Sequence, residues 1–283
     1  MKNEITVVIL TYNEEVNIAQ SVSNVMGWAQ DVFVLDSHSS DKTIEIAEKL
    51  GAKTFYRKFD NYAKQRNYAI KELPINTEWM LFLDADEYLT EELKYEISEV
   101  LGSSTTKNGF YMKRRFYFMG KWMRYGGYYP TKLLRLFKKE KGHVERDINE
   151  QVIVEGEVGE LQYDFVDENH KSIFDWIEKH NRYSSYEAQE LLNYDIRSAK
   201  GEVDEYADLF GTSPQRKRWV REYIWNPLLP PLVRPFFYYF YRYFFRLGFL
   251  DGRAGFIYYF LLCLWFYFII DVKYLELKRK NSV

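Results

Sequence analysis

Short apolar segments that alternate with amphipathic ones constrain the fold of this chain more than any other feature. The first of them, Ile5–Leu10, is continuous and rich in β-branched residues, which is typical of a strand buried on both faces of a parallel sheet. The segment Val16–Trp28 then carries apolar residues at helical spacing. Strand and helix keep alternating at short intervals, so the sequence predicts an α/β fold with a Rossmann-like, mostly parallel sheet and flanking helices.

The other expected elements follow this pattern, which loosens after residue 90. Further strands are expected at Val32–Leu35, Lys53–Tyr56, Trp79–Leu83, Gly109–Phe118, Lys132–Phe137 and Gln151–Val154. Further helices are expected at Thr43–Leu50, Tyr62–Leu73, Glu91–Leu101 and Ser172–Leu192. We therefore assign residues 1–200 to one α/β domain, with halves at 1–101 and 102–200, and residues 201–283 to a C-terminal region.

Polar side chains follow three of the expected strands, at the point where each strand ends. These stretches are Thr11–Glu14, Asp36–Asp41 and Asp84–Glu87. Ligands of open α/β sheets bind at the carboxyl ends of the strands. The sequence therefore predicts a binding site at one edge of the sheet.

The sharpest of these features is Asp84-Ala85-Asp86-Glu87, directly after a buried strand. Alternate residues at a strand end can place two carboxylates on the same side, and such hard oxygen ligands suit Mg²⁺ or Mn²⁺. We interpret Asp86 as a metal ligand and expect Asp84 to reach a ribose or a metal-bound water. The alternative is a solvated acidic turn that begins a helix.

The two other strand ends can form a nucleoside site. Residues Thr11 to Glu14, which include Tyr12, offer a hydroxyl and a carboxylate to a nucleoside, and Asp36 can accept from the N–H of a uracil-like base. The alternative for the second stretch is a capped turn, with Ser40 or Asp41 as the N-cap of the next helix. We expect Asp41 to serve mainly in that way and Asp36 to bind the ligand.

Seven segments resemble a known family. VVILTYNEE, VFVLDSHSSDKT, KQRNYAI and LFLDADEYL together resemble glycosyltransferase family 2, whose nucleotide-sugar-binding fold is called GT-A. INEQVIVEG, HKSIFDWIEKHNRYSSYEA and RLGFLDGRAGFIYYFLL resemble the bacterial branch that contains the lipopolysaccharide-core β-glucosyltransferases. The resemblance implies a Mg²⁺- or Mn²⁺-dependent transfer of a hexose or N-acetylhexosamine from a nucleoside diphosphate sugar, expected to be UDP-linked, to a glycolipid or polyprenyl-linked acceptor.

The resemblance also implies roles for single residues. Thr11, Glu14 and Asp36 would contact the nucleoside, and Asp84 and Asp86 would be the ribose and metal pair. Arg66 would reach the base or the pyrophosphate, since its planar donor fork suits both. The alternative for Arg66 is a solvated helix face.

An inverting transferase needs a base for the acceptor hydroxyl, and Glu150 is the candidate. It stands where this branch tends to have a His-Glu pair, but Asn149 precedes it here. Asp147 and Glu145 are competing candidates, and a plain acid at a strand edge is the alternative.

One motif points to a different function. The stretch from Gln215 to Trp219 matches QxxRW, a signature of processive polysaccharide synthases, although so basic a stretch can match by chance. Such synthases carry several membrane helices, whereas this sequence offers at most one. A processive synthase and a non-catalytic nucleotide-binding or membrane-scaffold protein are the rival functions.

The C-terminal region is basic and aromatic, which favours a membrane surface over nucleic acid. Pro214–Arg253 contains eight basic residues and two acids, and Tyr, Phe and Trp are concentrated around it. Ala254–Ile270 has no charge, and its length of about 26 Å falls just short of a bilayer core. This segment can span, dip and return, or pack in a groove; an aromatic core or a dimer interface is the alternative.

The rest of the sequence is consistent with a cytoplasmic catalytic domain. Met1–Glu4 leads directly into a strand pattern and not into the apolar stretch of a signal peptide. Cys263 is the only cysteine, so the chain forms no internal disulfide. We therefore expect the protein at the cytoplasmic face of a bacterial inner membrane, as a peripheral or monotopic protein or with one span.

Overall fold

The computed structural model describes residues 2–145, 151–199, 208–210, 215–216, 219–220 and 228–281. Contacts divide the chain into two compact units. The first comprises Met1–Arg124 and Tyr128–Lys171, and the second comprises Tyr125–Gly127 and Ser172–Val283. The boundary between the units lies at Lys171, whereas the expected catalytic domain runs to residue 200. The division into a catalytic domain and a C-terminal region at residue 200 therefore stays a prediction.

The first half of the α/β unit contains the expected alternation of strands and helices. Its elements are β1 (Asn3–Thr11), α1 (Ile18–Val25), β2 (Ala29–Asp36), α2 (Thr43–Lys49), β3 (Lys53–Tyr56), α3 (Tyr62–Glu72) and β4 (Trp79–Asp84). Each predicted segment is confirmed, with ends that differ by a few residues. The continuous apolar runs are the strands, as their burial on both faces requires.

The second half of this unit contains elements that the sequence did not indicate. It comprises β5 (Glu87–Leu89), α4 (Glu91–Gly102), β6 (Gly109–Phe118), β7 (Lys121–Trp122), β8 (Thr131–Lys138), η1 (Lys139–Lys141), β9 (Gly142–Glu145), β10 (Gln151–Val154) and β11 (Val158–Glu168). The predictions of α4, β6, β8 and β10 are confirmed. β5, β7, β9 and β11 were not predicted, and β11 turns out to border the candidate site.

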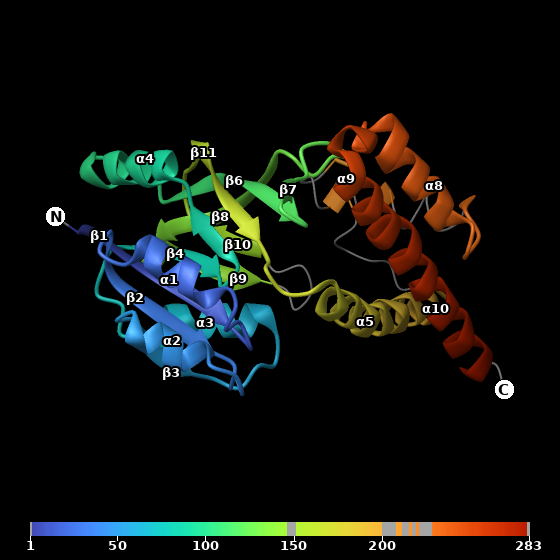
Figure 1. Ribbon diagram of the computed structural model, residues 1–283, viewed down its shortest axis with the longest axis horizontal. Helices are drawn as coiled ribbons and strands as arrows, with labels where there is room; N and C mark the ends of the chain where they lie inside the picture. The colour runs from blue at the N-terminus through green and yellow to red at the C-terminus, as the bar shows by residue number, and fades with distance from the viewer. Residues whose placement is uncertain are drawn as a thin grey trace. The chain divides into compact units, whose positions relative to one another are not determined.

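The sheet is parallel in its first half and mixed in its second. Its strand order is β3-β2-β1-β4-β8-β6-β11-β5, with β7 paired to β6 (Figure 1). The strands from β3 to β4 run parallel, β8 runs antiparallel to both β4 and β6, and β11 runs parallel to β6. The prediction of a mostly parallel sheet with flanking helices is confirmed.

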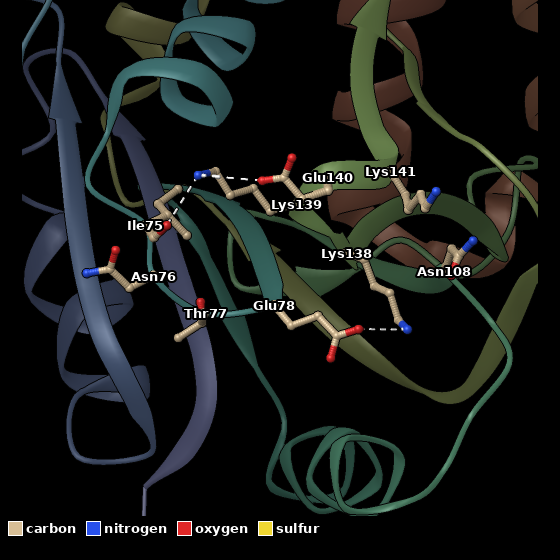
Figure 2. A pocket seen from close by; sticks show the side chains of 9 residues that line it. All are labelled: Ile75, Asn76, Thr77, Glu78, Asn108, Lys138, Lys139, Glu140 and Lys141. Atoms are coloured by element: carbon tan, nitrogen blue, oxygen red, sulfur yellow. Dashed lines mark hydrogen bonds and ion pairs between the residues drawn. The ribbon is translucent and has the colours of Figure 1, made fainter.

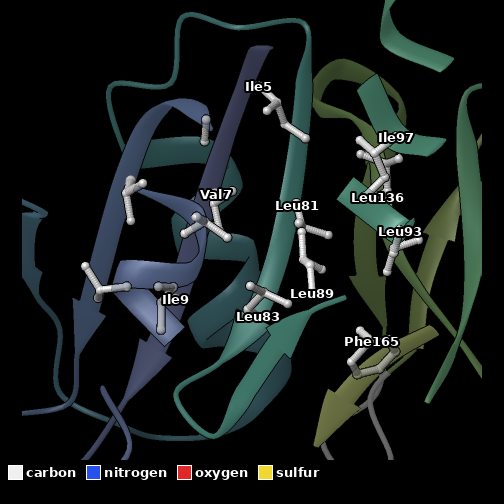
Figure 3. Packing of buried hydrophobic residues seen from close by; sticks show 14 of the residues in the cluster. Ile5, Val7, Ile9, Leu81, Leu83, Leu89, Leu93, Ile97, Leu136 and Phe165 are labelled. Carbon is white, nitrogen blue, oxygen red and sulfur yellow. The ribbon is translucent and has the colours of Figure 1, made fainter. Parts of the chain in front are cut away.

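Successive side chains of the central strands enter two different cores. Val7 and Ile9 of β1 belong to the cluster that contains α1, α2 and α4, whereas Val8 belongs to the cluster that contains α3. Figure 3 shows the first cluster, in which Leu81 and Leu83 of β4 extend the layer formed by β1. Because helices cover both faces, Ile5–Leu10 and Trp79–Leu83 are apolar except at Thr6, whose buried hydroxyl is bonded to that of Thr77.

The second unit is helical. It contains α5 (Ile173–Ala199), α8 (Arg234–Phe240), η3 (Tyr241–Phe245), η4 (Gly248–Asp251), α9 (Gly252–Tyr259), η5 (Phe260–Phe266) and α10 (Tyr267–Asn281), of which η3 and η5 have π-helical hydrogen bonding. α5 packs on α10 through Ala188, Leu192, Ile270 and Tyr274. The predicted aromatic C-terminal helices are therefore present. Within the described residues, Gly248–Asn281 is the one helix long and apolar enough to cross a membrane, by length and composition alone.

We expect Leu81→Ala to lower the free energy of unfolding by about 2–5 kcal/mol, because it would leave a cavity in the core on one helix-covered face of the sheet. Leu81 is fully buried and lies between Val7 of β1 and Leu136 of β8. Urea denaturation followed by circular dichroism measures the change. Val16→Ala, at a site that is 52% exposed, should shift stability by no more than about 0.5 kcal/mol, and equal shifts would contradict this account of the core.

Candidate functional site

Three parallel strands bring their carboxyl ends to one edge of the sheet. Thr11 is paired with Asp36 across β1 and β2, and Leu10 is paired with Asp84 across β1 and β4. The polar residues that follow these strands therefore start from adjacent positions. The predicted common edge is confirmed, and it is the candidate site.

The turns after β1 and β2 are bonded to each other. Asp36 is fully buried, and its carboxylate oxygens accept from the N–H of Ser39 at 2.7 Å and from its hydroxyl at 2.5 Å. The Ser39 hydroxyl oxygen accepts from the N–H of Asn13 at 2.7 Å, and the Asn13 side chain accepts from the N–H of Ser40 at 2.8 Å. Asp36 thus holds a turn in this structure, and its contact with a base stays a prediction.

Asp41 joins the same pair of turns to the start of α2. One of its carboxylate oxygens accepts from the N–H of Thr43 at 3.0 Å, and the other accepts from the N–H of Glu15 at 3.1 Å. The prediction of Asp41 as the N-cap of this helix is wrong, because Lys42 occupies that position, but the Asp41 carboxylate still accepts from the N–H of Thr43, the first residue of the helix.

Thr11 and Tyr12 differ in exposure. The Thr11 hydroxyl is buried and, among the described residues, has no hydrogen-bond partner. The Tyr12 side chain is 55% exposed. A buried hydroxyl is costly unless a water or a ligand satisfies it, so Thr11 fits the predicted contact with a bound group.

Asp84 is held by two arginines from different elements. The Arg66 guanidinium, on α3, lies 2.8 Å from Oδ1 of Asp84, and the Arg135 guanidinium, on β8, lies 2.8 Å from Oδ2. Arg135 also lies 2.7 Å from Oε1 of Glu87, whose Oε2 accepts from the N–H of Asp84 at 2.9 Å. Arg66 is therefore beside the acidic motif, and its contact with a base or pyrophosphate stays a prediction.

Two further carboxylates lie beneath this edge, Glu87 buried and Asp167 largely buried. Glu87 on β5 is paired with Asp167 on β11. Burial raises the pKa of both side chains, and the charge of Asp86 raises that of Asp167 further. Arg135 lowers the pKa of Glu87, and Arg114, 3.0 Å from Asp167, lowers the pKa of that residue. The edge thus concentrates negative charge that arginines compensate.

Asp86 is the freer carboxylate of the acidic motif. Its Oδ2 accepts from the side-chain amide of Asn169 at 2.8 Å, and its backbone carbonyl accepts from the N–H of Glu168 at 2.9 Å. Within the described part of the chain Asp86 forms no ion pair, whereas both oxygens of Asp84 are held by guanidinium groups. Asp86 therefore fits a cation ligand better than Asp84 does.

A protein cage for a cation is not needed at such a site. Among the residues that the structure describes, no three His, Cys, Asp or Glu side chains come together as a cation site. Mg²⁺ commonly uses one or two carboxylates together with substrate phosphates and water. One carboxylate, that of Asp86, is compatible with this mode, and Asp84 as a second ligand stays a prediction.

Glu14 is engaged by the segment that follows β11. The Lys171 ammonium lies 2.5 Å from Oε1 of Glu14, and the Asn17 amide donates to Oε2 at 2.7 Å. Asn17 also accepts from the N–H of His170 at 2.9 Å. Burial raises the pKa of Glu14, while Lys171 and Asn17 lower it. The contact of Glu14 with a nucleoside stays a prediction. The Glu14 carboxylate would have to make it while it is also paired with Lys171.

The candidate base falls outside the described residues. The range 146–150, which contains Glu150, Asn149 and Asp147, is not among the described residues. The same holds for Lys217 and Arg218 of the QxxRW match. Glu145 is described, with a side chain that is 59% exposed and 3.1 Å from Nε2 of His143. The assignment of the base therefore stays a prediction.

A surface pocket of about 500 Å³ lies at the other end of β4 (Figure 2). Glu78, which precedes β4, lines it together with Lys138 and Lys139, which end β8 and begin η1. Asp84 ends the same strand β4, so this pocket is separate from the carboxyl edge. Lys138 is bonded to Glu78 at 2.8 Å, so part of the positive charge in this pocket is already paired.

Sequence reasoning missed Arg135 and Asn169, which contact the acidic motif. Arg135 stands between Leu134 and Leu136 in an otherwise apolar part of a segment predicted to be a strand. An arginine at such a position needs a buried acidic partner, and that signal was available in the sequence. Asn169 carried no comparable signal, because β11 itself was not predicted.

Comparison with known proteins identifies a family. The family model described as Glycosyl transferase family 2 matches residues 6–148, half of the 283-residue chain. An uncharacterized glycosyltransferase of Rickettsia conorii is 38% identical over 103 residues, 36% of this chain and 36% of that protein. The chain thus spans about a third of the length of this relative. The lipopolysaccharide core biosynthesis glycosyltransferase LpsC of Rhizobium meliloti is 25% identical over 65% of this chain and 70% of that protein.

Solved structures give a weaker likeness. Glucosyl-3-phosphoglycerate synthase from Mycobacterium tuberculosis, in complex with Mn²⁺, uridine-diphosphate and glucosyl-3-phosphoglycerate, is 18% identical. The match covers 41% of this chain and 44% of that chain, with a TM-score of 0.33. Mannosyl-3-phosphoglycerate synthase from Rubrobacter xylanophilus is 16% identical over 40% of each chain, with a TM-score of 0.35.

We expect Arg135→Ala to lower the free energy of unfolding by about 3–5 kcal/mol near pH 8, because it removes the partner of a buried carboxylate. The loss should shrink at pH 5.5. Burial already raises the pKa of Glu87 above its ordinary 4.5, and removal of Arg135 raises it further. Such a group takes up a proton on folding, so its contribution is favourable at low pH and is lost as the pH rises through the folded-state pKa.

Urea midpoints of the wild type and the variant at both pH values measure this effect. Lys132→Ala is the matched control, since Lys132 lies on the same strand in an exposed ion pair with Glu160. It should change stability by about 1 kcal/mol at most, equally at both pH values. A loss for Arg135→Ala that does not depend on pH would contradict the assignment to Glu87.

Proposed function

Because the chain belongs to glycosyl transferase family 2, we propose that it transfers a hexose or an N-acetylhexosamine from a nucleoside diphosphate sugar, expected to be UDP-linked, to a lipid-linked glycan. The transfer inverts the anomeric carbon. The acceptor oxygen forms a bond to that carbon as the bond to the diphosphate breaks. The acceptor proposed is a lipopolysaccharide core or a polyprenyl-linked glycan.

The observation that carries this proposal is that three adjacent strands end side by side at one edge of the sheet. Thr11, Asp36 and Asp84 lie at the ends of adjacent parallel strands, on the edge where α/β sheets bind nucleotides. The mostly parallel sheet with flanking helices agrees with the predicted GT-A fold. The likeness to LpsC over 65% of the chain supports a lipopolysaccharide-type acceptor.

The donor would occupy the edge formed by these strands. The buried Thr11 hydroxyl, the exposed Tyr12 ring and Asp36 would receive the nucleoside, with Glu14 beside them. Arg66 would orient Asp84 toward the ribose through their ion pair. Because these side chains are already held in place, binding the donor would cost less conformational entropy.

Asp86 would hold a divalent cation together with phosphate oxygens of the donor. A bound Mg²⁺ or Mn²⁺ would supply neutralisation of the negative charge on the diphosphate leaving group. Asn169 would orient the Asp86 carboxylate by the hydrogen bond that it donates at 2.8 Å. Because both oxygens of Asp84 are paired with arginines, Asp86 is the carboxylate that would hold the cation more readily.

Glu150 would accept the proton of the acceptor hydroxyl. A general base lowers the barrier by removing that proton as the oxygen attacks. Glu145, the competing candidate that lies among the described residues, has an exposed carboxylate beside His143.

The acceptor half, residues 102–200, and the C-terminal region, residues 201–283, would present a membrane-borne acceptor. We place the protein at the cytoplasmic face of a bacterial inner membrane. The apolar helix Gly248–Asn281 supports membrane association by its length and composition. A lipid-linked substrate is confined to that surface, so an enzyme attached there meets it more often.

We expect Asp86→Asn to lower sugar transfer about 10²-fold or more, because an amide holds a divalent cation poorly. Asn169→Ala should lower it about 10- to 100-fold and raise the Mn²⁺ concentration needed for half-maximal rate. The measurement is nucleoside diphosphate release with detergent-solubilised membrane lipid as acceptor. Glu91→Gln, at a side chain that is 83% exposed, is the matched control and should keep full activity.

Other outcomes of this assay identify the rivals. Full activity in the presence of a chelator would contradict the cation site. No turnover of any donor by the wild type, combined with nucleotide binding, would identify a non-catalytic protein. Products of many sugar units would identify a processive synthase, for which the Gln215–Trp219 match is the supporting observation.

We expect Glu150→Gln to lower the transfer rate about 10²- to 10⁴-fold with little change in donor affinity, because only proton removal is affected. Glu145→Gln should keep most of the activity. Rates at saturating donor, together with donor binding by calorimetry, separate the two effects. A large loss for Glu145→Gln and none for Glu150→Gln would move the base to Glu145.

A further inference from the structure

Helix α8 and its continuation η3 expose an unbroken aromatic face. Six aromatic residues, each at least 45% exposed, recur in pairs every four positions. They are Phe236, Phe237, Phe240, Tyr241, Phe244 and Phe245. Side chains with this spacing share one side of a helix, so they form a single apolar stripe, which we call the α8–η3 face. Exposed apolar stripes of this kind mark binding surfaces.

The opposite side of this helix is occupied by the rest of the unit. Tyr238 packs edge-on against Tyr267, and Tyr243 contacts Phe256 and Tyr259. Figure 1 shows α8, α9 and α10 as neighbouring helices of one helical unit. The helix is therefore already packed on its inner side. Phe236, at the edge of the α8–η3 face, also contacts Phe268, and among the described residues the rest of this face is the side that remains for a partner.

The charge around this face is positive. Between Leu228 and Ile270 the only acidic residue is Asp251, which is buried and accepts from the N–H of Tyr125 and the hydroxyl of Tyr259. Arg246 and Arg253, in contrast, are exposed. Aromatic rings beside exposed arginines match the boundary between acyl chains and anionic headgroups, where guanidinium groups meet lipid phosphates.

The long apolar helix is held at both ends by polar segments. At its beginning, Asp251 is bonded to Tyr125 and the carbonyl of Arg246 accepts from the N–H of Gly126, so the turn is fastened to the loop between β7 and β8. At its end, Lys273 and Lys278 bond to α5, which follows β11. Both segments continue directly into strands of the α/β unit, which must stay in water.

The length left free of α5 is too short to span a bilayer. Phe266 already contacts His180 of α5, with ring centroids 5.4 Å apart, and α5 exposes charged residues such as Glu178 and Arg182. A helix with such charges does not enter hydrocarbon. The stretch from Ala254 to Trp265 rises about 18 Å, against about 30 Å of hydrocarbon.

We propose that the C-terminal helices form a monotopic anchor, in which the α8–η3 face lies flat on an anionic bilayer and Gly248–Asn281 does not cross it. This deepens the membrane association proposed above, but its tests measure lipid binding and topology without any sugar transfer. The rings enter the headgroup region, and Arg246 and Arg253 meet the phosphates. Both ends of Gly248–Asn281 remain on one side of the bilayer.

Vesicle co-sedimentation of the full chain tests the surface. We expect binding to vesicles of phosphatidylethanolamine and phosphatidylglycerol, and weaker binding to phosphatidylcholine alone. F240S/F244S/F245S should lower the partition coefficient about tenfold or more. Arg253→Gln should lower it about fivefold on anionic vesicles only. Tyr95→Ser, which removes a ring 69% exposed on α4, is the matched control and should change nothing.

Two results of this experiment would overturn the proposal. One is unchanged binding of the triple variant with its thermal melting intact. The other is a wild-type chain that ignores vesicles and sediments as a dimer, with the triple variant monomeric, which would assign the face to a second copy.

Cysteine labelling tests the topology. In a Cys263→Ala background, Lys2→Cys and Lys280→Cys report the two ends of the chain, since Cys263 is the only native cysteine. A membrane-impermeant maleimide should leave both protected in intact spheroplasts of a bacterial host and label both after lysis. Labelling of Lys280→Cys alone in intact spheroplasts would mean that the helix spans, and the monotopic anchor would be wrong.

Discussion

Compensation of buried negative charge by arginine is the constraint on which this site depends. Asp84, Asp86, Glu87 and Asp167 gather at one edge of the sheet, and the buried carboxylate of Glu87 cannot leave water without a cationic partner. Arg135 meets two of them from β8, the strand that runs antiparallel between β4 and β6. Strand β8 therefore supplies a cation to this edge as well as apolar side chains to the core.

The elements that could be predicted are those whose hydrophobic pattern is visible within a short stretch of sequence. The runs Ile5–Leu10 and Trp79–Leu83 are apolar except at Thr6 because two helical layers cover them, and that condition is visible in the sequence. β11 was not predictable in the same way. Its burial alternates irregularly, and it pairs with β6, which is distant in the sequence, so only the tertiary structure defines its register. Asn169 and Lys171 follow β11 and were missed for that reason.

The site differs from its prediction mainly in which partners its polar groups already have. Asp36, Glu14 and Arg66 were expected to await a ligand, and each instead bonds to a neighbouring side chain. Residue type alone cannot reveal this, since a carboxylate suited to a nucleoside is equally suited to a serine or a lysine. Thr11 is the reverse case, because its hydroxyl is buried without a partner among the described residues.

The segment from Glu168 to Lys171 is anchored at several points within four residues. The N–H of Glu168 and the side chain of Asn169 bond to Asp86, while His170 and Lys171 bond to Asn17 and Glu14. Connecting segments ordinarily accept insertions and deletions as sequences diverge. This one cannot, since a single added residue would displace one anchor or the other. Its length, more than the identity of any one of its residues, is the property that descendants of a common ancestor would keep.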